Sequence, residues 1–279
     1  MATLFSVTDF VRLRSWWYHN GIFLLGVVFS GISKVHFYQI IIGFIVSSLY
    51  LAHGYALNGY YDYAGYEDAA ALRKNNIVLV IFPWLLLMCN IILSLFLLPE
   101  VLILILFGSV LSWMYSAPPF FIKKNPILRL VFNAVGFSLL FLIGVRLTGV
   151  WNKEALSMFS FFCILFIPIE LIHDLNDAPE DVKFHIKTVP VLLGEKVTVF
   201  LVSLSLILLF SYALLLMLLG YAGLIFIILT FFFILSLIVL LSAHFLSKKY
   251  GFSKYSGIKA KARIIAGVYL IALLIIFIK

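Results

Sequence analysis

The chain has 279 residues, of which 64% are hydrophobic and 11% are charged, and its net charge is +8. A typical soluble domain is about 45–50% apolar and about 25% charged, so this chain has too few charged residues to cover a soluble surface. The composition excludes a soluble enzyme, a nucleic-acid-binding domain and a disordered chain as first interpretations, and it leaves a polytopic membrane protein.

Nine apolar segments are candidates for membrane-spanning helices, which need roughly 20 mostly apolar residues each. In chain order they cover approximately 15–32, 37–61, 77–97, 101–116, 128–146, 155–173, 196–219, 221–246 and 262–278. Polar or turn segments separate them, and only the short segment 220–223 separates the seventh from the eighth. We therefore expect an all-α fold, with one transmembrane domain over residues 1–279 and about nine helices bundled around a central cavity.

The basic residues predict the orientation of these helices, because Lys and Arg concentrate on the cytoplasmic side of membrane proteins. With the N-terminus in the cytoplasm and nine crossings, nearly all of the 20 Lys and Arg residues fall on that side. The exceptions are Lys34, Arg146, Lys153 and Lys279. We therefore expect an integral, multi-pass, N-in/C-out protein. The basic run from Lys248 to Arg263 is expected to contact anionic headgroups, with a gate over a site as the alternative.

Most of the 12 acidic residues gather in two short clusters, both on the expected cytoplasmic side. One cluster follows the second predicted span and contains Asp62, Glu67 and Asp68. The other ends the sixth span and contains Glu170, Asp174, Asp177, Glu180 and Asp181. Carboxylates near membrane depth are costly and need partners, so this placement indicates a functional site. The alternative is a set of solvated loop acids that balance nearby lysines.

Four acids of the second cluster share one face of a helix. At about 100° per residue they form a stripe roughly 60° wide; they are Glu170, Asp174, Asp177 and Asp181. Pro179 is expected to end the regular helix, which would place Asp181 in a loop.

In the first cluster, Asn58 and Asp62 lie four positions apart and so share a helix face in the same way. Mg²⁺ is commonly bound by a few carboxylates together with substrate phosphates. Two such clusters facing each other across a cavity would hold two Mg²⁺ ions, which would bind a diphosphate.

Three segments resemble motifs of the UbiA superfamily of intramembrane prenyltransferases. The second acidic cluster resembles the family pattern Asp-x-x-Asp-x-x-x-Asp with a Thr-x-Pro-Val-x-x-Gly tail, at Asp174, Asp177, Asp181, Thr188, Pro190, Val191 and Gly194. YSAPPFFIKKNP resembles the family's Tyr-Ser-x-Pro-Pro-x-x-x-Lys loop, at Tyr115, Ser116, Pro118, Pro119 and Lys123. NGYYDYAGYED resembles the first Asp-rich motif, at Asn58 and Asp62. The three segments occur in family order.

The first motif departs from the family pattern. Gly59 and Tyr66 stand where the family has Asp, and Glu67 and Asp68 lie just beyond. The third ligand of the first metal is therefore left open between Glu67 and Asp68.

The resemblance implies a Mg²⁺-dependent enzyme that ionises a prenyl diphosphate to an allylic cation and transfers the prenyl group to an acceptor, usually an aromatic ring of the quinone-precursor type. It implies that one Mg²⁺ ion binds to Asn58, Asp62 and either Glu67 or Asp68. The other ion would bind to the three Asp residues of the second motif, Asp174, Asp177 and Asp181.

The resemblance also implies roles for basic and aromatic residues around the diphosphate. Phosphate contacts are expected from Lys123, Lys124, Arg129, Lys183 and Lys187. Tyr115 would bind the diphosphate or the acceptor. The residues expected to be catalytic are Asp62, Asp177, Lys123 and Tyr115.

Other functions stay open at this point. The same fold could use a glycerol-phosphate lipid as acceptor, or act as a terpene cyclase. From other classes, a cation-coupled transporter and a lipid-binding scaffold are alternatives, although the acids lie at helix ends rather than at the midplane expected of transport sites. His173 and His185 flank the second motif. They could act as a base or contact the acceptor, or they could be helix-end residues that only form local hydrogen bonds. The expected partners are a prenyl diphosphate, an aromatic or lipid acceptor and membrane lipids, without nucleic acid.

Overall fold

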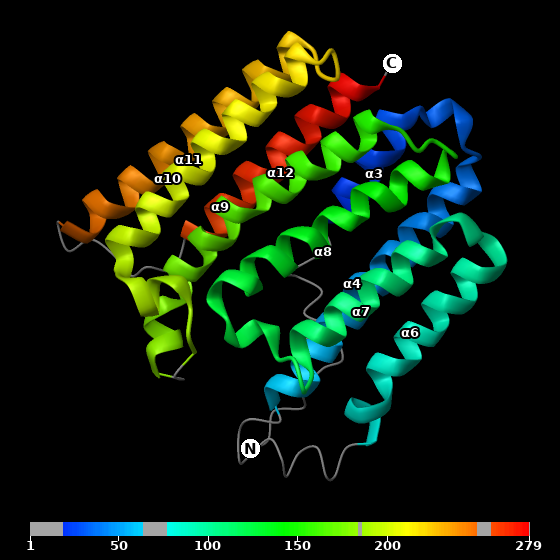
Figure 1. The fold of residues 1–279 in the computed structure, drawn as a ribbon, viewed down its shortest axis with the longest axis horizontal. Coiled ribbons are helices and arrows are strands. Elements are labelled where there is room, and N and C mark those ends of the chain that lie inside the picture. Colours follow the sequence, from blue (N-terminus) through cyan, green and yellow to red (C-terminus); the bar gives the residue numbers. More distant parts are fainter. Residues whose placement is uncertain (1–18, 64–76, 184–185, 250–257, 279) are drawn as a thin grey trace. The chain divides into compact units, whose positions relative to one another are not determined.

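The computed structural model describes residues 19–63, 77–183, 186–249 and 258–278, and all regular structure within them is helical (Figure 1). The α-helices are α3 (Asn20–Ser30), α4 (Phe37–Tyr63), α6 (Ile77–Leu97), α7 (Leu102–Ser116), α8 (Pro126–Leu147), α9 (Lys153–Lys183), α10 (Val189–Leu218), α11 (Leu224–Lys249) and α12 (Ile258–Phe277). Short 3₁₀ turns are η2 (Ile32–Lys34), η3 (Pro99–Val101) and η4 (Ile122–Lys124). The all-α class expected from the sequence is confirmed.

Eight of the helices in the described ranges are long and apolar enough to cross a membrane. The first predicted span, 15–32, corresponds to the shorter helix α3, and the start of that span lies outside the described residues. Large apolar side chains point outward; Phe37 is 76% exposed and Leu218 is 79% exposed. Such surfaces are unfavourable in water and suit contact with lipid tails. The chain is therefore a multi-pass membrane protein, while its N-in/C-out orientation stays a prediction.

The chain divides into two compact units. Unit 1 contains Met1–Lys123 and Leu139–Trp151, and unit 2 contains Lys124–Ser138 and Asn152–Lys279. Helix α8 therefore contributes its first half to unit 2 and its second half to unit 1. The single domain over 1–279 stays a prediction.

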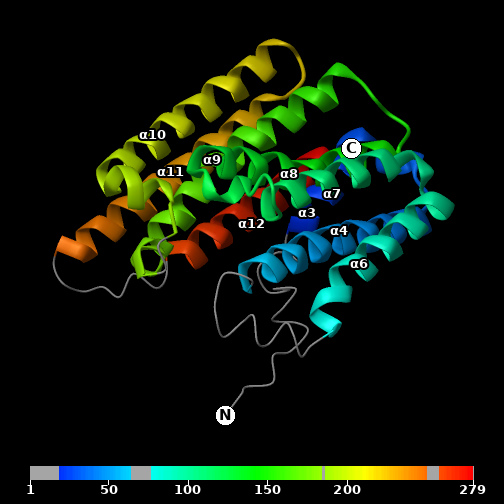
Figure 2. The ribbon, with the colours of Figure 1, turned by 60° about the horizontal axis from the view of Figure 1, so that its bottom comes forward.

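In unit 1, α4 packs against α6 and α7, and Figure 2 shows α4 and α6 side by side. Helix α3 and the second half of α8 approach each other closely at two glycines. A Cβ atom added to Gly26 would lie 2.0 Å from the carbonyl oxygen of Phe141, and one added to Gly144 would lie 2.1 Å from that of Phe23. Small residues of this kind let two backbones touch inside a membrane.

In unit 2, α9 packs against α10 and α12, and α11 packs against α10 and α12 (Figure 1). The core of this unit contains the fully buried rings of Phe161, Phe162 and Phe226. The ring centroids of Phe161 and Phe226 lie 4.9 Å apart, which joins α9 to α11. This packing holds α9, the helix that carries the second acidic motif.

Helix α9 does not end at Pro179 as expected; it continues through that residue to Lys183. A proline removes one backbone hydrogen bond and bends a helix. The helical turn beyond Pro179 is nevertheless stabilised by contacts of Asp181. The carbonyl of Asp181 accepts a hydrogen bond from the backbone N–H of Ile186 at 2.8 Å, and the Asp181 side chain is buried. Asp181 therefore lies on the same helix as Asp174 and Asp177.

Helix α10 begins at Val189, earlier than the predicted position 196, with Pro190 in its first turn. Gly194 interrupts the helix with φ +81° and ψ 164°, a conformation that is essentially restricted to glycine. The sequence-based start at 196 thus marks the regular helix that follows this break.

Candidate active site

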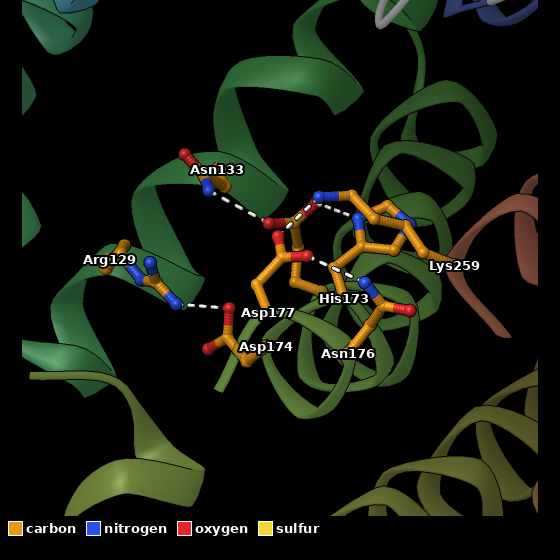
Figure 3. Close-up of polar contacts among 8 residues, drawn as sticks. Arg129, Asn133, His173, Asp174, Asn176, Asp177 and Lys259 are labelled. Atoms are coloured by element: carbon orange, nitrogen blue, oxygen red, sulfur yellow. Dashed lines mark hydrogen bonds and ion pairs between the residues drawn. The ribbon is translucent and has the colours of Figure 1, made fainter. Parts of the chain in front are cut away.

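The second acidic motif forms a charged cluster on α9 in unit 2 (Figure 3). Asp174 is only 5% exposed, and its carboxylate forms an ion pair with Arg129 of α8. An opposite charge is the partner that a buried carboxylate needs. The structure thus places Arg129, expected at the phosphates, directly against the first Asp of the motif.

Asp177 lies one turn further along α9 and has two partners. Its Oδ2 atom forms an ion pair with Lys259 of α12, and its Oδ1 atom accepts a hydrogen bond of 2.8 Å from Nδ2 of Asn176. The side chains of Lys259 and Asp177 are 30% and 35% exposed. Asp177 is therefore more accessible to solvent than Asp174.

Asp181 occupies the last turn of α9. Burial raises the pKa of its carboxyl group above the usual range, and this outweighs Thr188 and Arg129, which favour the charged form. A cation placed at this carboxylate would reverse that effect.

Glu170 lies outside the family motif but begins the same stripe of acids. Its Oε2 atom accepts a hydrogen bond of 3.0 Å from Nδ2 of Asn133, and Nδ1 of His173 lies 3.6 Å from its Oε1 atom. The hydrogen bond from Asn133 joins α8 to α9 beside the Asp174–Arg129 pair, and the contact with His173 lies within α9. The expectation that His173 lies at the end of a helix is wrong, because α9 continues to Lys183; its contact with Glu170 is local, within α9.

A second cluster lies in unit 1, where α4 meets the loop after α7. Oδ1 of Asn58 accepts hydrogen bonds from Nζ of Lys123 at 3.2 Å and from Oγ of Ser116 at 3.4 Å. The rings of Tyr61 and Phe121 meet edge to face, with centroids 6.2 Å apart. The structure thus brings the first motif and the Pro-Pro loop together, as Asn58 and Lys123.

The remaining predicted site residues differ in exposure and in how far the structure describes them. Tyr115, in the last turn of α7, is half-buried, whereas Lys124 in η4 and Lys187 between α9 and α10 are exposed. The structure describes only the backbone of Asp62 and Lys183. Glu67, Asp68 and His185 lie outside the described residues.

The residues of the second motif fit a hard divalent cation. Within the described ranges no three His, Cys, Asp or Glu side chains form a ready-made metal cluster, and Asp174 and Asp177 each pair with a basic side chain. However, Oδ2 of Asp174 is buried and has no hydrogen-bond partner among the described residues. A buried carboxylate oxygen of this kind needs a donor or a positive charge, and oxygen is the ligand that Mg²⁺ prefers.

The profile of the UbiA prenyltransferase family matches residues 21–254. The chain belongs to the UbiA prenyltransferase family. This membership confirms the family expected from the three motifs, and with it the enzyme class, a prenyltransferase. No curated protein matches the sequence.

Solved structures share the UbiA fold. A UbiA homologue from Archaeoglobus fulgidus bound to DMAPP and Mg²⁺ is 15% identical, with a TM-score of 0.75 over 98% of each chain. A UbiA homologue from Archaeoglobus fulgidus bound to GPP and Mg²⁺ is 17% identical, with a TM-score of 0.69 over 98% of this chain and 99% of that chain. A digeranylgeranylglyceryl phosphate synthase is 18% identical, with a TM-score of 0.72 over 98% of this chain and 97% of that chain.

Sequence reasoning missed two residues that contact the stripe of acids on α9, namely Asn133 at Glu170 and Lys259 at Asp177. Asn133 follows Arg129 by one helical turn, so the expected role of Arg129 could have pointed to the same face of α8. Lys259 is 82 positions from Asp177 and belongs to no motif. It is part of the basic run expected to contact headgroups, and the structure pairs it with Asp177 instead.

Proposed function

We propose that this member of the UbiA family is a Mg²⁺-dependent intramembrane prenyltransferase that transfers the prenyl group of a prenyl diphosphate to an aromatic acceptor of the quinone-precursor type. One observation carries the proposal. In a UbiA chain, α9 presents Asp174, Asp177 and Asp181 along one face, with Arg129 and Lys259 beside them. The Mg²⁺ and prenyl diphosphates bound to the Archaeoglobus fulgidus homologue support the same chemistry.

The charges of this cluster suit the departure of a diphosphate. The bond between the prenyl carbon and the diphosphate oxygen breaks, and its electron pair leaves with the pyrophosphate. Mg²⁺, bound by Asp174, Asp177 and Asp181, would supply positive charge to that leaving group. Arg129 fixes the position of Asp174 in advance, which is the kind of preorganisation that stabilises developing charge without rearrangement.

We assign the cluster in unit 1 to the same reaction. Asn58 orients Lys123 through the 3.2 Å hydrogen bond, so that the ammonium is positioned for phosphate oxygens. Asp62, with Glu67 or Asp68, would bind a second Mg²⁺ ion. Further phosphate contacts are proposed for Lys124, Lys183 and Lys187, and Tyr115 would bind the diphosphate or the acceptor.

The acceptor then forms a new bond to the prenyl carbon and loses a proton to solvent. An aromatic ring is the acceptor that the resemblance to the family implies. A glycerol-phosphate lipid is the second candidate, and the similarity in fold to the digeranylgeranylglyceryl phosphate synthase favours it.

The test uses purified protein in lipid nanodiscs with labelled prenyl diphosphates of increasing length, Mg²⁺, and either an aromatic acceptor, a glycerol-phosphate lipid or none. A prenylated ring, identified by mass, is the expected product, and chelation of Mg²⁺ should abolish it. A prenylated lipid would establish the second candidate, and a cyclised hydrocarbon without acceptor would establish a cyclase. Absence of pyrophosphate release with every diphosphate would contradict the proposal.

A further inference from the structure

The first turn of α12 carries a lysine that faces the motif on α9 rather than the surrounding medium. Lys259 follows the helix start at Ile258, and its ammonium pairs with Asp177 (Figure 3). Lys261, two positions later on the same helix, is exposed. The two lysines carry the same charge at the same end of α12, but only Lys259 reaches a carboxylate of the motif.

The contact between Lys259 and Asp177 competes directly with metal binding. Oδ1 of Asp177 accepts a hydrogen bond from Asn176, and Oδ2 is paired with Lys259. A Mg²⁺ ion bound at about 2.0–2.1 Å to a carboxylate oxygen would repel an ammonium at the same oxygen. Metal binding at Oδ2 of Asp177 therefore requires Lys259 to move away from that oxygen.

The two ion pairs of the cluster differ in how easily they can separate. The side chains of Arg129 and Asp174 are only 16% and 8% exposed, whereas those of Lys259 and Asp177 are 30% and 35% exposed. Separating a buried pair leaves an uncompensated charge, while a partly exposed pair separates at small cost. In addition, lysine carries its charge on a flexible four-carbon stem. Arg129 is thus the fixed cation and Lys259 the movable one.

Building on the proposed function, we propose that Lys259 is a diphosphate-binding residue that exchanges partners. It pairs with Asp177 until Mg²⁺ binds, and it then binds an oxygen of the diphosphate. The exchange makes the two ligands interdependent, because Mg²⁺ alone has to displace Lys259, whereas Mg²⁺ with a diphosphate gives Lys259 a new partner. This coupling favours binding of metal and diphosphate together.

The exchange predicts opposite effects on two affinities in Lys259→Gln. Without the competing ammonium, the affinity for Mn²⁺ alone, measured by electron paramagnetic resonance, should rise about fivefold. The affinity for inorganic pyrophosphate in saturating Mg²⁺, measured by calorimetry, should fall about tenfold because a charged contact is lost. Lys261→Gln removes the same charge from the same end of α12 and should change neither affinity. A Lys259→Gln variant in which both affinities fall, or neither changes, would overturn the exchange.

A second measurement uses the unmodified chain and does not depend on the folding of a variant. Acetylation of Lys259 by a water-soluble reagent, followed by mass spectrometry, should become faster when Mg²⁺ is added and slower again when pyrophosphate is added with Mg²⁺. A rate that is the same in all three conditions would refute the exchange. If the unmodified chain binds neither Mn²⁺ nor pyrophosphate, the proposed function itself fails, and the exchange fails with it.

Discussion

The close approach of α3 and α8 in unit 1 gives a sharp prediction for Gly144→Ala. The new Cβ would lie 2.1 Å from the carbonyl oxygen of Phe23, 2.8 Å from the backbone nitrogen of Val27 and 3.1 Å from the carbonyl carbon of Gly26. All three are backbone atoms, so no side chain can rotate away. Because non-bonded heavy atoms prefer about 3.5–4.0 Å, the helices would have to separate by more than about 1 Å.

We expect Gly144→Ala to lower the free energy of unfolding by about 1–3 kcal/mol, the usual cost of overpacking. The free energy is measured by titrating the protein in mixed micelles with SDS and following tryptophan fluorescence. The matched control is Gly267→Ala in α12, where nothing lies within 4 Å of the added Cβ. There, alanine should raise the free energy of unfolding by about 0.5–1 kcal/mol, because glycine is the poorer helix former.

The partner glycine extends the test. An alanine at Gly26 would lie 2.0 Å from the carbonyl oxygen of Phe141 in the same crossing. Once the helices have separated for one alanine, the second meets less resistance, so the double variant should lose less stability than the sum of the single variants. If Gly144→Ala were as stable as the unmodified chain, or if the two changes simply added, this account of the crossing would be wrong.

Three further predictions concern the motif on α9. Asp177→Ala should lower Mg²⁺-dependent pyrophosphate release at least about a hundredfold while the protein stays monodisperse, and Glu154→Ala, an exposed acid at the start of the same helix, should leave release unchanged. Arg129→Gln should lower the free energy of unfolding by about 3 kcal/mol in the SDS titration by leaving the buried Asp174 unpaired. Adding Asp174→Asn should restore most of that stability without restoring activity, and a double variant no more stable than Arg129→Gln would contradict the pairing. Gly194→Ala should cost about 1–3 kcal/mol in the same titration because of its φ of +81°; an unchanged midpoint would show that the break in α10 is not required.

The membrane helices could be predicted well because span length and hydropathy are local properties. The predicted span 101–116 corresponds to α7, and the short separator 220–223 lies between the end of α10 at Leu218 and the start of α11 at Leu224. The local preference of Pro179 predicts that the helix ends there. This prediction is wrong because the backbone hydrogen bond from Ile186 and the buried side chain of Asp181 stabilise the helical turn beyond the proline. Tertiary contacts of this kind have no signature at the proline itself.

In the candidate site too, the features that depend on local sequence could be predicted, and those that depend on packing between helices could not. Positions three and four apart on one helix face the same way, so the stripe on α9 followed from spacing alone. The contact between Asn58 and Lys123 joins two motifs that resemblance had already marked. By contrast, the pair of Lys259 and Asp177 depends on how α12 packs against α9. Spacing within one helix carries no information on that packing.

The charges of the cluster on α9 explain why it needs both a divalent cation and a lysine that can change partners. The stripe on α9 carries four carboxylates, and the ion pairs supply two cations, Arg129 and Lys259, which leaves a formal charge of −2. One divalent cation neutralises that charge in a region where unbalanced charge is costly. A diphosphate then brings new negative charge, which needs a cation that is not already committed. Arg129 is held by the buried Asp174, whereas Lys259 becomes available once metal occupies Asp177. The scarcity of charged residues in this chain thus favours a lysine that serves the carboxylate and the diphosphate in turn.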